Sequence, residues 1–128
     1  MRNQIESWLD QFEIDHPLRG HVVEVIFSLP GPVRDDLMGD ESFVLCAFDA
    51  RADGQAIRVR LQAGRPGRCV ALKTALGARS DGFARYVIAH ELAHAHLRNR
   101  GRWPDDDPEQ AADALAADWG FPRPAKWG

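Results

Sequence analysis

The chain of 128 residues contains no run of about 18 apolar residues, the length that a membrane-spanning helix needs. Its first stretch, MRNQIESWLDQF, also lacks the unbroken apolar segment of a secretion signal. The only cysteines are Cys46 and Cys69, which favours two buried thiols in a reducing compartment over a disulfide framework. These absences predict a cytoplasmic protein without a membrane-spanning segment.

The chain also lacks a strong excess of charge of either sign. Its 16 basic and 19 acidic residues leave a formal net charge of -3, too little to attract nucleic acid or an anionic membrane over the whole surface. Basic residues gather in the middle of the chain, at Arg51, Arg58, Arg60, Arg65 and Arg68, and acidic ones gather later, at Asp105, Asp106 and Asp107. Such runs are usually solvated surface, and we interpret both in that way.

Nucleic-acid binding is the least favoured of the functions that the composition allows. It would have to use the arginines of a single strand, Arg58 and Arg60, and few aromatic residues interleave with them. We therefore expect no nucleic-acid partner.

The length is that of a single domain, so we treat residues 1–128 as one unit with one core. The spacing of Ile5, Trp8, Leu9 and Phe12 predicts a helix over residues 2–14. Further helical segments are predicted over 20–28 and 33–38.

Strand character follows the helices. Three stretches have it, at 42–49, 55–63 and 69–73, and the sequences DARADG and GRPGR supply turns between them. Alternation of Ile57, Val59 and Leu61 with arginines predicts a sheet with one dry and one wet face. The sequence thus predicts an α+β fold with N-terminal helices and a short, mainly three-stranded sheet.

Two helices are predicted in the last third of the chain. The first begins near Ser80 or Asp81 and ends near Arg98 and Arg100, where the helix dipole favours positive charge. The second has Asp107 as N-cap, Pro108 at its first position, Gln110 completing a capping box, and Gly120 beyond its end.

The first of these helices contains VIAHELAHAHL, residues 87–97, in which three histidines and one glutamate interrupt an apolar run. His90 and His94 are four residues apart and so share a face about one turn apart, whereas His96 lies about 200° around from His94. Two imidazoles so placed can chelate zinc, and Glu91 can act as general base on a water at the open position. Structural core histidines are the alternative, but burying them without partners would cost several kcal/mol.

A catalytic zinc site needs a third protein ligand. No histidine or cysteine follows His96, so the ligand must be a carboxylate. Glu109 is favoured, because the apolar stripe of Ala112, Leu115, Ala116 and Trp119 would dock the last helix beside the first. Asp113 shares the face of Glu109 and could accept a hydrogen bond from a ligating imidazole. Asp113, Asp118 and residues 105–107 remain alternative ligands.

The two motifs together resemble a known family. YVIAHELAHAHL followed by PEQAADALAADWGF is similar to the compact gluzincin zinc metallopeptidases and looks most like the ImmA/IrrE-type group. In that group an H-E-L-x-H helix precedes an E-x-x-A-[ND]-x-[FL]-A helix. The resemblance implies a minimal zincin-like fold with zinc bound by His90, His94 and Glu109. It also implies that Glu91 is the catalytic base and that Asp113 accepts a hydrogen bond from a zinc ligand.

We therefore expect a zinc metallopeptidase whose partner is a peptide or protein substrate, held in extended form along the strand at 69–73. Tyr86, His96 and Arg102 are candidates for stabilising the oxyanion. The alternative is an inactive, zinc-stabilised binding or regulatory module. Glu91 argues against it, because a purely structural site would be closed by a fourth protein ligand.

Overall fold

The computed structural model describes residues 1–48, 68–97 and 108–125. Its elements are α1 (Arg2–Leu9), α2 (Leu18–Ser28), α3 (Gly31–Met38), β1 (Val44–Phe48), β2 (Cys69–Lys73), the 3-10 helix η1 (Thr74–Ala78), α5 (Asp81–Leu97) and α6 (Pro108–Asp118). The described part is α+β and mainly helical, as expected in coarse outline. The 3-10 helix was not predicted.

Helix α1 is shorter than the predicted helix over 2–14. The backbone N–H of Asp10 closes the helix on the carbonyls of Glu6 and Ser7. Beyond it the chain turns, yet Phe12 still packs edge-on against Trp8, with ring centroids 5.1 Å apart, and Ile14 is buried. The apolar spacing therefore continued past the end of the helix because the turn packs on the same core.

The next two helices lie close to their predicted bounds. Arg34 of α3 donates hydrogen bonds to three carbonyls at the end of α2, those of Ile26, Phe27 and Leu29. The last carbonyls of a helix have no partner within it. A single side chain of α3 therefore caps α2 and joins the two helices.

Two of the three predicted strands lie among the described residues and form a sheet. β1 and β2 are direct neighbours and run parallel, with Val44 opposite Cys69 and Phe48 opposite Lys73. Residues 55–63 lie outside the described residues, so a third strand stays a prediction. A parallel pair cannot be joined by a single tight turn, and the connection between β1 and β2 lies outside the described residues.

The core lies where the helices meet one face of the sheet. Leu45, Val70 and Leu72 are buried on the strands, and they belong to a single apolar cluster with residues of α1, α2, α5 and α6. Cys46 is buried, Cys69 is half-buried, and both are thiols. None of the described helices is long and apolar enough to cross a membrane.

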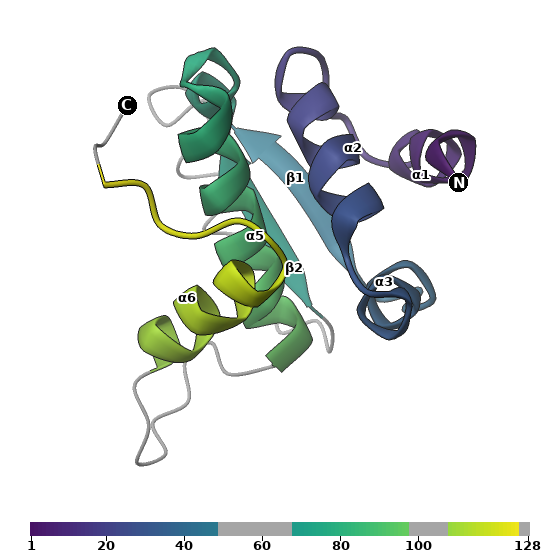
Figure 1. The fold of residues 1–128 in the computed structure, drawn as a ribbon. Helices are drawn as coiled ribbons and strands as arrows, with labels where there is room; N and C mark the ends of the chain where they lie inside the picture. Colours follow the sequence, from purple (N-terminus) through teal and green to yellow (C-terminus); the bar gives the residue numbers. More distant parts are fainter. Residues whose placement is uncertain (49–67, 98–107, 126–128) are drawn as a thin grey trace.

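Helix α5 is the element that touches most of the others. It contacts α2, α3, α6 and β2, and Figure 1 shows it between α2 and α6. It begins as predicted, because the Ser80 hydroxyl accepts a hydrogen bond from the backbone N–H of Phe83 at 3.4 Å. Arg98 and Arg100, predicted at its far end, lie outside the described residues. Side chains on different faces of α5 therefore meet different elements.

Arg68 corrects the interpretation of the central arginines as solvated surface. Only 8 % of the residue is exposed, and its guanidinium contacts the carboxylates of Asp36 and Asp40 and the carbonyl of Ala95. Burial of a charge is tolerated when it is paired and hydrogen-bonded. The partners lie 27 to 32 residues away in sequence, so the run of arginines gave no sign of them.

Helix α6 ends as the sequence predicts. Gly120 has a φ of 98°, a left-handed conformation that residues with a side chain rarely adopt. The N–H groups of Gly120 and Phe121 bond the carbonyls of Ala117 and Ala116, which is the Schellman arrangement for closing a helix. The predicted N-cap, Asp107, lies outside the described residues.

Candidate metal centre

Docking of α6 on α5 brings the two motifs together. Ala112, Ala116 and Trp119 are buried, and Leu115 is half-buried against the core. This is the apolar stripe predicted from the sequence. Because Glu109 and Asp113 lie beside that stripe at a spacing of four residues, burying it turns both carboxylates toward α5.

His90, His94 and Glu109 converge at the contact between the helices. We call these three residues the histidine–glutamate group. The Oε2 atom of Glu109 lies 2.6 Å from Nε2 of His90 and 3.1 Å from Nε2 of His94, and the two Nε2 atoms are 3.1 Å apart. The group could hold a metal ion. His94 is buried while the Glu109 side chain is 68 % exposed, so the group is open to solvent at the glutamate.

Asp113 contacts the other nitrogen of His90. Its Oδ1 lies 2.7 Å from Nδ1 of His90. A carboxylate only accepts hydrogen bonds, so the contact assigns the proton of a neutral His90 to Nδ1 and leaves a lone pair on Nε2. That lone pair faces the carboxylate oxygen of Glu109. Two acceptors at 2.6 Å repel each other unless a proton or a cation lies between them.

Both carboxylates are held in the ionised form, which is the form that binds a metal. Burial opposes ionisation of Glu109, but its interactions with the imidazoles of His94 and His90 outweigh this effect and lower the pKa of Glu109. Burial likewise opposes ionisation of Asp113, and hydrogen bonds from Tyr86 and His90 lower the pKa of that side chain.

The sequence suggested further residues for the site in addition to the histidine–glutamate group. Glu91 follows His90 directly on α5 and is half-buried. Asp118, an alternative ligand, is exposed at the opposite end of α6 from Glu109, and the possible metal group does not include it. Residues 102 and 105–107 lie outside the described residues.

Two of the candidates for stabilising an oxyanion have other partners. His96 faces away from the group, as predicted, and its Nδ1 lies 2.8 Å from the Asp36 carboxylate of α3. The Tyr86 hydroxyl donates a hydrogen bond to Oδ1 of Asp113 at 2.6 Å. Sequence reasoning missed this second role for Tyr86, although its position four residues before His90 places it on the same face of the helix.

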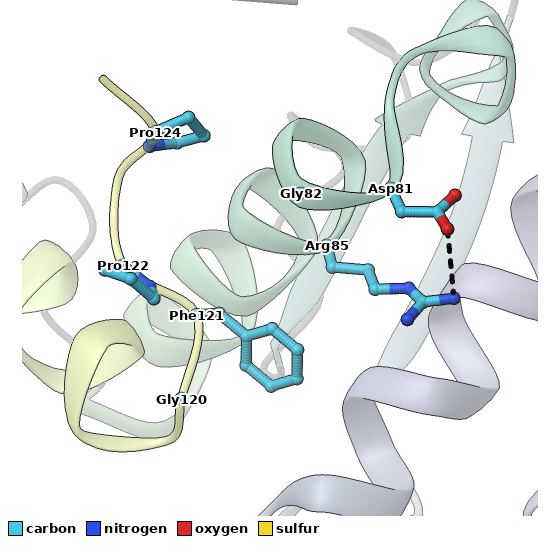
Figure 2. A pocket seen from close by; sticks show the side chains of 7 residues that line it. All are labelled: Asp81, Gly82, Arg85, Gly120, Phe121, Pro122 and Pro124. Atoms are coloured by element: carbon cyan, nitrogen blue, oxygen red, sulfur yellow. Dashed lines mark ion pairs between the residues drawn. The ribbon is translucent and has the colours of Figure 1, made fainter. Parts of the chain in front are cut away.

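A separate hollow of about 360 Å³ lies between the first turn of α5 and the tail that follows α6. Figure 2 shows Arg85 and Phe121 at this hollow, with the Arg85 guanidinium directed toward Asp81. Arg85 also contacts His21 of α2, at 3.3 Å. None of the three residues of the histidine–glutamate group lines the hollow.

Comparisons of the chain with protein families, with curated proteins and with solved structures found no match. The function must therefore be inferred from the chemistry of the residues at the contact between α5 and α6.

Proposed function

We propose that this protein is a zinc-dependent metallopeptidase of the gluzincin type. His90, His94 and Glu109 would hold the metal, and Glu91 would be the general base. The observation that supports this most directly is the convergence of two Nε2 atoms and one carboxylate oxygen within 3.1 Å of each other. Two imidazoles and one carboxylate form a set of three protein ligands known for catalytic zinc.

We favour a bound metal ion over a shared proton because three ligand atoms converge at this point, and one proton would bridge only two of them. A single proton could bridge His90 and Glu109, but it would leave the Nε2 atom of His94 only 3.1 Å from both. A cation at the common point would be bound by all three atoms at once, with His94 as well as His90 offering the lone pair of its Nε2. Zinc is proposed because imidazole nitrogen and carboxylate oxygen are ligands that it commonly takes in proteins.

The protein's own residues divide the catalytic work. Zinc, when bound, supplies a Lewis acid that polarises the scissile carbonyl and lowers the pKa of a water to about 7. Glu91 takes the proton of the attacking water and passes it to the leaving amine. Asp113 keeps the proton of His90 on Nδ1, so that Nε2 remains available as a ligand.

The substrate is proposed to be a peptide in extended conformation. Among the described strands, β2 is paired by β1 on one side, and α5 packs on β2. The other edge of β2 is proposed to bind the peptide backbone through hydrogen bonds that depend little on side chains. Such binding would give affinity with modest sequence selectivity.

Comparing wild type with Glu91→Gln tests the proposal. Both proteins should contain stoichiometric zinc, because Glu91 is not a ligand. Hydrolysis of a fluorogenic peptide library should fall by about 10² to 10⁴-fold in Glu91→Gln, the usual contribution of a general base. Glu41→Gln is the matched control, since Glu41 is exposed on a turn before β1 and its loss should leave both readouts unchanged.

The two measurements separate the alternatives. A wild-type chain that retains no zinc would overturn the proposed metal site. Zinc retained in both proteins, with no peptide hydrolysis by wild type, would instead support the inactive zinc-stabilised module.

A further inference from the structure

We propose that Tyr86 is a positioning residue that holds Asp113 in place and thereby aligns His90 toward the metal. This inference rests on the metal site of the proposed function. It adds to that site a residue that is not itself a proposed metal ligand.

The hydrogen bonds at Asp113 carry the inference. One oxygen, Oδ1, accepts from the Tyr86 hydroxyl at 2.6 Å and from Nδ1 of His90 at 2.7 Å. A carboxylate oxygen has two lone pairs, so these two donors use both of them. Short hydrogen bonds to an ionised acceptor are among the stronger ones in proteins. The pair fixes both the position and the direction of Oδ1.

Tyr86 also supports His90 directly. The two residues are four apart on α5, and their rings pack with centroids 5.8 Å apart at an angle of 51°. Tyr86 itself is only 6 % exposed. The packing of the Tyr86 ring and the contact of Asp113 with Nδ1 therefore both limit the movement of the imidazole.

The Tyr86 hydroxyl is suited to a permanent donor role. The hydroxyl donates a hydrogen bond to Oδ1 of Asp113 at 2.6 Å, and an ionised carboxylate can only accept. A hydroxyl already engaged in this way is less suited to stabilising an oxyanion, the role considered for Tyr86 from the sequence.

A double-mutant cycle on zinc affinity tests the proposal in the full-length chain. Zinc affinity is measured by competition with a chromogenic chelator for wild type, Tyr86→Phe, Asp113→Ala and the double variant. Tyr86→Phe keeps the ring and removes only the hydroxyl, and we expect it to weaken zinc binding about tenfold, the lower end for partners that orient ligands. In the Asp113→Ala background the same change should alter the affinity by less than about twofold, because the hydroxyl acts through Asp113.

Two further measurements distinguish positioning from a general structural role. Ile88→Val is the matched control, because Ile88 is buried on α5 but lies two residues from both Tyr86 and His90, about 200° around the helix. It should leave zinc affinity unchanged. With cobalt in place of zinc, the visible absorption spectrum of Tyr86→Phe should differ from that of wild type, and the spectrum of Ile88→Val should not.

The outcomes separate this inference from the proposed function. If wild type binds zinc and Tyr86→Phe binds it equally well, the positioning role is wrong while the metal site stands. An equal loss in both backgrounds would show that Tyr86 does not act through Asp113, and would also overturn the inference. If wild type binds no zinc, the metal site and the positioning role fail together.

Discussion

Helix α5 contributes to two polar clusters whose negative charges are balanced in different ways. The histidine–glutamate group lies on the face toward α6. The second cluster, which we call the arginine cluster, consists of Arg68, Asp36, Asp40 and His96 and lies toward α3. Both bring carboxylates and imidazoles together in partly buried positions, but only the arginine cluster contains a guanidinium among its members.

In the arginine cluster, donors and acceptors match. Arg68 donates to both carboxylate oxygens of Asp36, at 2.7 and 3.2 Å, and to Asp40 at 2.9 Å. The histidine–glutamate group instead brings two imidazole nitrogens and a carboxylate oxygen within 3.1 Å of one another, and this group could hold a metal ion. In the first cluster a side chain of the protein supplies the positive charge, whereas under the proposed function a bound cation would supply it in the second.

The largest expected effect is that of zinc on stability. At a free zinc concentration about 1,000 times the dissociation constant, binding should raise the free energy of unfolding by about 4 kcal/mol. His94→Ala should abolish this increment, because it removes a buried ligand. Denaturant unfolding with and without zinc measures both values. An equal increment in His94→Ala would place the zinc at some other site.

Removal of the buried Arg68 guanidinium should have the next largest effect on the free energy of unfolding. Arg68→Met leaves Asp36 and Asp40 without their guanidinium, and we expect the free energy of unfolding to fall by about 3 kcal/mol. Zinc should still stabilise this variant by the same increment as wild type. Arg2→Met is the control, since it breaks an exposed pair with Glu24 and should have a much smaller effect. If Arg68→Met lost zinc binding, the two clusters would not be independent.

Lowering the pH should reduce the stability that the arginine cluster contributes, but by a smaller amount. Hydrogen bonds from the Ser42 hydroxyl and amide, and from Arg68, lower the pKa of Asp40 from 3.8 to about 2. The unfolded chain therefore binds more protons than the folded chain in this range. The stability that Asp40 contributes is present above its unfolded pKa and is lost as the pH falls toward 2.

Denaturant unfolding of wild type and Asp40→Asn, at several pH values between 5 and 2 and with a chelator present, measures this effect. The stability of Asp40→Asn should decline less steeply than that of wild type. Parallel curves would mean that folding does not favour the ionised form of Asp40.

Local sequence patterns predicted the two helices of the candidate site well. Ser80 starts α5 and Gly120 follows α6, as expected, because capping depends on residues a few positions apart. The apolar stripe of α6 also predicted which face would be buried, and with it the direction of Glu109 and Asp113. The part of the candidate site that follows from helical periodicity could therefore be found without coordinates.

Pairings between distant residues could not be found in that way. The sequence predicted the strands β1 and β2 but did not show that they pair directly and in parallel. Arg68 belonged to a run of arginines typical of a surface, yet α3 supplies two carboxylates that make its burial possible. In both cases the deciding partner lies far along the chain, and a local pattern carries no information about it.

The sequence alone determined that His90 and His94 share one face of a helix, because the geometry of an α-helix relates residues four apart. It also determined that α6 carries two carboxylates on one side. Only the tertiary structure decided that these carboxylates reach the two imidazoles, that Tyr86 bonds Asp113, and that Arg68 joins α3 to the end of α5. Those contacts depend on how separate elements pack, and packing is set by the whole core.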